Sequence, residues 1–321
     1  MTMNNSDILF LYDAKLTNPN GDADDENRPR MDYERSINLV SDVRLKRYVR
    51  DYLENKGHEI FVAKVEDQTL NATNRLKSLF EKYEGNVNLN KITVEQRDWM
   101  LDQLIDVRLF GATMPIKSQE QGNKGSSMTL TGPVQFNWGY SLNKVSLVES
   151  STITSHFSSE ESNERGAMGK DYRVYYSFIA FHGVISASRA KHTRLKEEDI
   201  YLLDEAMIRA IPLLATRSKV GQQPRLYLRV EYNSDQFILG DLRDYIRLEE
   251  QEALRSVSEV RLIIDDLVEK LVKVNEQINT IHLWQDQYLT IVHDGKQGSL
   301  DSLLPEQLQV KCKPVKGAVH V

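Results

Sequence analysis

The sequence has a single cysteine, Cys312, among its 321 residues. One thiol can form neither an internal disulfide framework nor a cysteine-based zinc site. No segment approaches the roughly 20 consecutive apolar residues that a membrane-spanning helix needs. The first residues show neither the basic nor the apolar region of a secretory signal. These absences predict a soluble, cytoplasmic protein that has no membrane partner and needs no cofactor.

Several familiar motifs are missing as well. The polar loop at 117–127 contains glycines and a lysine but lacks the spacing of a P-loop. The seven histidines do not occur at metal-ligand spacing. The RNP1 consensus is absent, so a conventional base-stacking RNA-recognition face is not indicated. A net charge of −6 argues against a surface coated with nucleic acid. Phosphate binding, however, depends on the local density of basic groups.

The highest local density of basic groups follows an acidic loop. This loop has turn signals at Pro19 and Asn20–Gly21 and carboxylates from Asp22 to Glu26. Residues 36–55 then show helical periodicity, with apolar side chains along one side. The other side carries Arg44, Lys46, Arg47 and Arg50. Such a row could follow a phosphate backbone, or it could be a solvated face paired with nearby acids.

The order of the predicted elements indicates an α+β fold. We expect strands at 8–12, 108–113, 129–138, 173–187 and 226–232, and helices at 36–55 and 196–215. A strand–helix–strands–helix–strand order is typical of the split βαβ, or ferredoxin-like, fold, which is also the scaffold of RNA-recognition modules. Residues 64–106 suggest a small helical insertion with a capping box at Thr93. The chain beyond Asp241 is predicted to be helical.

Two further segments are candidates for binding. Residues 216–225 form a basic loop that leads into a strand of alternating polarity. That alternation predicts outward side chains at Arg225, Tyr227 and Arg229. This row could stack and clamp bases, or it could be an ordinary solvent face. Residues 150–173 have few large apolar side chains, so we expect them to project from the body.

Several of these segments together resemble a known family. The signature stretches are Asn18-Pro19-Asn20-Gly21-Asp22, Arg28-Pro29-Arg30 and 41–52, followed by 108–112, 131–136, 168–170 and 181–187. In this order, over roughly residues 6–235, they resemble the backbone subunit of type I CRISPR Cascade complexes. That subunit is Cas family seven of the RAMP superfamily, and the detail is similar to subtypes I-B and I-C.

The resemblance implies a division of the chain. It suggests a ferredoxin-like (RRM-like) palm, a helical "fingers" insertion, and a projecting "thumb" hairpin that pinches guide RNA between neighbouring subunits. The palm would comprise 1–56, 131–149 and 173–240, the fingers 57–130, the thumb 150–172, and a C-terminal helical extension 241–321.

It also implies a function without catalysis. Copies of the subunit would polymerise head to tail along CRISPR guide RNA, beside other Cascade subunits, and leave the bases free to pair with target DNA. We expect no catalytic residue and no metal. The expected RNA-binding residues are Asn18, Asn20, Gly21, Arg28, Arg30, Ser41, Arg44, Lys46, Arg47, Arg165, Met168, Lys170, Arg217, Ser218, Lys219, Gln222 and Arg225.

Two alternatives stay open. In related type III subunits a loop aspartate cuts target RNA, so Asp22 to Glu26 could serve a metal-dependent endoribonuclease. Side chains of a consecutive run point in alternating directions in extended chain, which works against their convergence on one ion. A protein-only scaffold would explain the negative charge. It would not explain why basic residues concentrate at 44–50 and 217–229.

Overall fold

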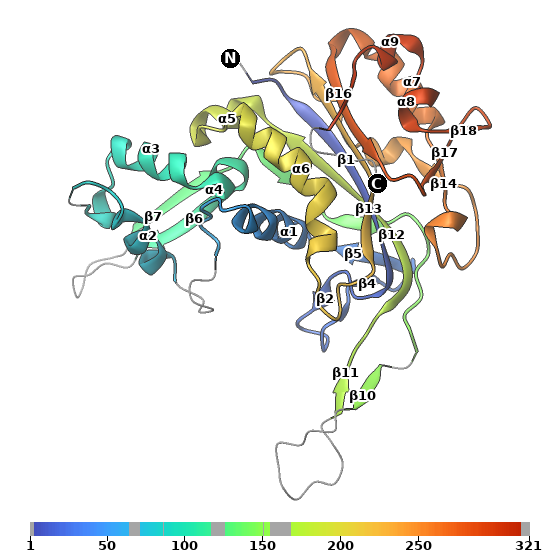
Figure 1. Ribbon diagram of the computed structural model, residues 1–321, viewed down its shortest axis with the longest axis horizontal. Coiled ribbons are helices and arrows are strands. Elements are labelled where there is room, and N and C mark those ends of the chain that lie inside the picture. Colours follow the sequence, from blue (N-terminus) through green and yellow to red (C-terminus); the bar gives the residue numbers. More distant parts are fainter. Residues whose placement is uncertain are drawn as a thin grey trace, which may run out of the picture.

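The computed structural model describes residues 3–63, 71–85, 87–116, 126–149, 151–154 and 168–315. These residues form an α+β fold around a nine-stranded sheet, which runs in the order β19-β16-β13-β1-β12-β9-β5-β4, with β8 paired to β12 (Figure 1). Its strands are β1 (Ser6–Thr17), β4 (Met31–Asp32), β5 (Ile37–Val40), β8 (Val134–Phe136), β9 (Gly139–Ser141), β12 (Val174–Ile185), β13 (Gln222–Tyr232), β16 (Ile278–Gln285) and β19 (Cys312–Pro314).

Strand β1 is the centre of this sheet and is buried on both faces. Ile8, Phe10 and Tyr12 point to a core shared with helices α1 (Asp42–Asn55) and α6 (Glu197–Leu213). Leu9 and Leu11 point to a second core, built with the C-terminal part of the chain. A continuous apolar run is what such a two-sided strand requires, so the strand predicted at 8–12 is confirmed and is longer than expected.

The first helix begins later than its periodicity predicted. Ile37–Val40 forms strand β5, which pairs with β9 through Leu39↔Tyr140 and Val40↔Gly139. Ser41 then caps α1 in an extended conformation. Two successive apolar patterns, one for a strand and one for a helix, were merged into one prediction. The helix predicted from residue 36 is therefore wrong at its start and right at its end.

An insertion follows α1 and has its own small core. It contains α2 (Ala72–Phe80), the 3₁₀ turn Leu89–Lys91, α3 (Val94–Gln103), α4 (Ile105–Phe110), β6 (Gly111–Ile116) and β7 (Ser126–Thr131). The capping box of Thr93 with Gln96 is present as predicted. The strand expected at 108–113 is wrong in its first half, because α4 continues to Phe110. Gly111, at φ +74°, ends that helix and starts β6.

Two other strand predictions need correction. The strand expected at 129–138 is divided into β7 and β8 at Gly132-Pro133, where the proline has no N–H for a sheet bond. Beyond residue 241 the chain is not simply helical. It forms a four-stranded sheet, and β16 and β19 join the main sheet. The extra elements are β14 (Arg247–Leu248), β15 (Arg261–Ile263), α7 (Asp265–Lys273), β17 (Thr290–His293), β18 (Lys296–Gly298), α8 (Leu300–Leu303) and α9 (Glu306–Gln309).

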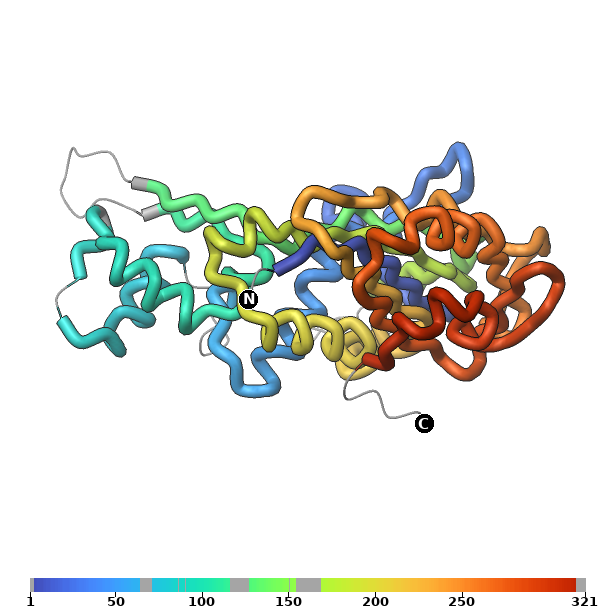
Figure 2. The backbone as a smooth tube through the Cα atoms, turned by 90° about the horizontal axis from the view of Figure 1, so that it is seen from above, coloured from blue at the N-terminus to red at the C-terminus, as the bar shows by residue number. Residues whose placement is uncertain are grey.

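The molecule is elongated. Figure 2 shows the insertion at one end and the C-terminal part at the other. A two-stranded hairpin, β10 (Thr152–Thr154) with β11 (Met168–Lys170), projects from the body where a projection was expected (Figure 1). Residues 155–167, with Arg165, lie outside the described residues. Among the helices that the structure does describe, none is long and apolar enough to cross a membrane.

Candidate nucleic-acid interface

The end of β1 is joined to the loop that follows α6. The N–H of Asn18 donates to the carbonyl of Ser218 at 3.0 Å, and that of Lys15 donates to the carbonyl of Gly221 at 2.9 Å. Gly221 has φ +108°, and a Cβ there would lie 2.6 Å from the Lys15 carbonyl oxygen. Only glycine allows this approach. The loop that follows β1 and the basic loop at 216–225 therefore meet at one end of the sheet.

The polar loop is also tied to the start of α1. Oδ1 of Asn20 accepts hydrogen bonds from the backbone N–H of Ser41 at 2.8 Å and from its hydroxyl at 2.9 Å. The Ser41 hydroxyl oxygen accepts one from the N–H of Arg44 at 3.3 Å, which caps the helix. A Cβ on Gly21 would lie 1.8 Å from Oδ1 of Asn27, so the turn has no room for a side chain.

Two cations share this junction without a carboxylate. The guanidinium of Arg44 lies 4.1 Å from the centroid of the Tyr48 ring, and the Tyr48 hydroxyl donates to Oε1 of Gln222 at 3.0 Å. Nε and Nη2 of Arg44 are buried and have no hydrogen-bond partner among the described residues. Lys219 donates to the carbonyls of Asn18 and Pro19, at 2.5 Å and 3.1 Å. Burial and then the charge of Arg44 lower the pKa of Lys219 to about 7.

Such a pair is electrostatically incomplete. Burying a charge is costly unless an opposite charge or several hydrogen bonds compensate it. No described carboxylate lies within ion-pair distance of Arg44 or Lys219. An anion at the junction would supply the missing partner. The arrangement is thus suited to hold a phosphate.

The other predicted cations of this region face the acidic loop. Arg30 pairs with Asp22 at 3.0 Å, and Lys170 pairs with Glu26 at 2.7 Å. Arg28 lies 3.7 Å from Asp25 and 4.7 Å from the centroid of the Tyr172 ring. Arg217 pairs instead with Asp171, the residue after β11, at 3.0 Å. In the described chain the loop carboxylates therefore contact cations rather than one another.

A metal site in the acidic loop has no geometric support. The group of described side chains close enough to share an ion comprises Asp265, His293 and Asp294, on the turn between β17 and β18 and the start of α7. No member of the loop from Asp22 to Glu26 belongs to it. That group is partly exposed, and Asp265 already accepts hydrogen bonds from the His293 ring and the Asp294 N–H.

Three predicted residues lie apart from the junction. Lys46 is buried between Asp42 and Gln135, at 3.0 Å and 2.9 Å. Arg47 pairs with Asp51, at 2.6 Å, further along α1. Arg225 is held by Asp13 at 3.1 Å and Asp286 at 2.6 Å. Their contribution to RNA binding stays a prediction, as does that of Met168, of which the structure describes the backbone pairing in β11.

The outward arginine–tyrosine–arginine row of β13 is a wrong prediction. Tyr227 and Arg229 are 0% and 2% exposed, because α6 covers this face of the strand. Asp204 of α6 accepts hydrogen bonds from the Tyr227 hydroxyl at 2.6 Å and from Arg229 at 2.7 Å. Arg50 is likewise buried and pairs with Asp106, so the helix arginines do not form a single exposed row.

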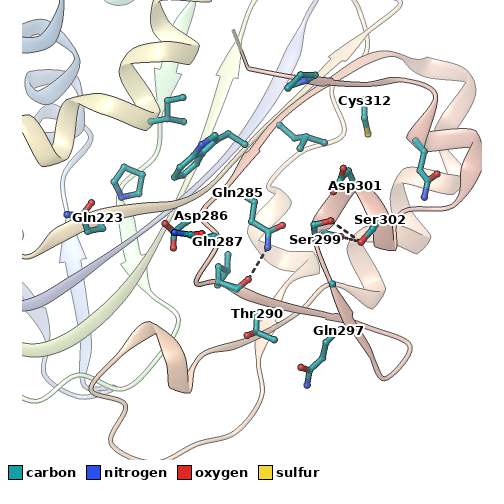
Figure 3. Close-up of a pocket in the computed structure, with 18 of the residues that line it drawn as sticks. Gln223, Gln285, Asp286, Gln287, Thr290, Gln297, Ser299, Asp301, Ser302 and Cys312 are labelled. Carbon is teal, nitrogen blue, oxygen red and sulfur yellow. Dashed lines mark hydrogen bonds between the residues drawn. The ribbon is translucent and has the colours of Figure 1, made fainter. Parts of the chain in front are cut away.

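A large cavity lies elsewhere and does not fit phosphate. It has a volume of about 1130 Å³ and lies between β13, β16 and the C-terminal part (Figure 3). Its lining combines Trp284 and prolines with glutamines such as Gln223 and Gln297 and the carboxylates of Asp286 and Asp301. Among the described residues that line it there is no lysine or arginine. The residues expected to bind RNA therefore lie outside this cavity.

Tyrosines were the partners that sequence reasoning missed. Tyr48 supports Arg44, and Tyr172 contacts both Arg28 and Glu26, donating to the latter at 2.7 Å. The spacing of four residues between Arg44 and Tyr48 was a usable signal, because such positions are neighbours on a helix. Nothing in the sequence indicated the contact between Tyr172 and the acidic loop.

Comparison with known proteins agrees with the earlier resemblance. The family model of CRISPR-associated protein Cas7 matches residues 4–265. CRISPR-associated protein Cas7 of Haloferax volcanii is 35% identical over 304 residues, which are 90% of this chain and 89% of that protein.

Two solved chains share the fold. One comes from a CRISPR RNA-guided surveillance complex described as pre-nicking, with a TM-score of 0.54 and 13% identity over 88% of this chain and 93% of that one. The other comes from a CRISPR RNA-guided surveillance complex, with a TM-score of 0.50 and 14% identity over 88% of each chain. The family model and the 35% identical relative establish that the chain belongs to the Cas7 family of CRISPR-associated proteins.

Proposed function

We propose that this chain is a non-catalytic subunit that coats CRISPR guide RNA and presents it for pairing with target DNA. Copies would associate head to tail and act with other subunits of a Cascade complex. A heterologous interface of that kind gives an open filament rather than a closed ring. Specificity would come from base pairing with the guide.

The observation that carries the proposal is the Arg44–Lys219 junction. It combines two cations, unpartnered guanidinium nitrogens and backbone carbonyls from the family's signature stretches. A sugar-phosphate backbone offers an anion at regular spacing, whereas a protein scaffold would not need one at a buried site. Binding through phosphates also leaves the base edges available for pairing.

The topology supports the finer architecture as a proposal. The order β13-β1-β12-β9, with α1 and α6 on one side, is the arrangement expected of a ferredoxin-like palm. The insertion with its own core would be the fingers, and the β10–β11 hairpin would be the base of the thumb. We keep 57–130 and 150–172 as the proposed boundaries of the fingers and the thumb.

Replacing Arg44 by alanine should weaken binding of any RNA sequence by about tenfold at moderate salt, because one charge-assisted phosphate contact is lost. The slope of log affinity against log salt should fall in magnitude by roughly 0.7, the value for one phosphate on a single strand. Fluorescence anisotropy with two unrelated RNA sequences measures both quantities. Arg189→Ala is the matched control, because Arg189 is an exposed arginine of α5 (Ala187–Thr193), at the other end of β12. An equal loss in both variants would show that only bulk charge matters.

A second experiment tests the nuclease alternative. The purified chain, loaded with guide RNA, should leave complementary RNA uncut in Mg²⁺ or Mn²⁺, because the loop carboxylates face cations rather than a shared ion. A parallel sample treated with a nonspecific ribonuclease is the positive control, because it shows that cleavage products of the RNA would be detected. Regularly spaced cuts that disappear in Asp22→Ala would favour the endoribonuclease instead.

A further inference from the structure

An exposed indole is held beside the strand pair that leads into α1. Trp138 connects β8 to β9 and is 44% exposed. Gly139, the next residue, pairs with Val40 in antiparallel register, and Val40 directly precedes Ser41, the cap of α1. The backbone at Trp138 thus lies close to the start of α1, the helix that carries Arg44.

The backbone of Trp138 is fixed in this position. Its N–H donates to Oδ1 of Asn137 at 2.8 Å, and its carbonyl accepts from Arg243 at 2.8 Å. The Arg243 guanidinium is itself buried and lies 4.4 Å from the Tyr140 ring. Behind the indole, a Cβ on Gly139 would lie 2.4 Å from the Phe181 ring, so the strand cannot shift inward. A large apolar side chain is therefore presented to solvent by a rigid backbone.

The indole contacts an arginine that is itself paired with Asp22. The Arg30 guanidinium lies 5.7 Å from the centroid of the Trp138 ring, and the Arg30 N–H donates to the Asn20 carbonyl at 3.0 Å. Sites for single-stranded nucleic acid combine a positively charged path for the backbone with aromatic rings on which bases stack.

We propose that the indole of Trp138 is a stacking platform for one base of the bound RNA strand. The inference rests on the proposed RNA binding and adds a base contact to it. Stacking tolerates every base, because each base has a π face. It also releases no counterions. Its loss should therefore lower affinity without changing the salt dependence, unlike the loss of a phosphate contact.

The probe is the shortest oligoadenylate that forms a one-to-one complex with the full chain, because copy–copy contacts cannot contribute to its affinity. Trp138→Ala should weaken binding by about tenfold with an unchanged salt slope, and Trp138→Phe should restore most of the affinity. Val94→Ala, which trims a side chain that is 60% exposed on α3, is the control and should have no effect.

Fluorescence gives an independent readout. The chain has three tryptophans, and quenching by RNA should be largely absent in Trp138→Phe. Unchanged affinity in Trp138→Ala, while Arg44→Ala still weakens binding, would overturn the stacking inference alone. If neither Trp138→Ala nor Arg44→Ala lowers RNA affinity, the proposed function is overturned as well. A Trp138→Ala defect that is confined to longer RNA holding several copies would mark the indole as a protein contact, and would likewise overturn the inference.

Discussion

RNA binding should weaken by up to about 50-fold when the pH is raised from 7 to 9, because the complex must hold a proton that the free protein has lost. In the free chain, burial and the charge of Arg44 lower the pKa of Lys219 to about 7. A bound phosphate would return this pKa toward the ordinary lysine value of about 10.4. Between these two values each pH unit costs up to about tenfold in affinity.

The groups around Lys219 support an RNA affinity that falls, rather than rises, as the pH increases. An arginine guanidinium keeps its proton throughout this range. Burial raises the pKa of Tyr12 and of Tyr48, so both stay neutral at pH 9. Titrating anisotropy with an oligoadenylate at constant salt measures the effect. Lys219→Arg should bind RNA with little dependence on pH above 7, because its guanidinium does not lose its proton there. A dependence that persists in Lys219→Arg would assign the proton to another group.

Local elements were largely predictable from the sequence. The apolar run at 8–12, the capping box at Thr93 and the amphipathic pattern of α6 each depend on neighbours within a few residues, and each appears in the structure. Errors arose where one pattern ended and another began. The strand pattern of Ile37–Val40 continues without a break into the helix pattern of α1.

The partners of charged residues were not predictable. Strict alternation along β13 predicted one solvent face, but α6 brings Asp204 to Arg229 and makes that face a second interior. Asn18 and Lys219 are 201 positions apart and meet only in the fold. The family resemblance pointed to stretches that meet in the fold. Which cations lack a carboxylate depended on distances that no sequence pattern contains.

Replacing Asp106 by alanine should cost about 3–5 kcal/mol of the free energy of unfolding, which is the usual effect of removing one partner of a buried ion pair. Asp106 is 0% exposed. Its carboxylate accepts hydrogen bonds from Nε of Arg50 at 2.9 Å and from the N–H groups of Phe61 and Val62, at 2.7 Å and 3.2 Å. One side chain of α4 thus holds α1 and the start of the insertion together. Urea unfolding followed by tryptophan fluorescence measures the loss.

Two comparison variants test whether the stability lost in Asp106→Ala comes from the burial of the ion pair or from the loss of a charge alone. Glu269→Ala breaks an exposed pair with Lys273 on α7 and should leave the free energy of unfolding almost unchanged. The double variant Arg50→Met with Asp106→Leu should recover part of the loss, because no uncompensated charge is left inside. It should not recover all of it, since the N–H groups of Phe61 and Val62 still lack an acceptor. A loss below about 1 kcal/mol in Asp106→Ala would mean that water reaches Arg50 and that Asp106 does not anchor α1 to α4.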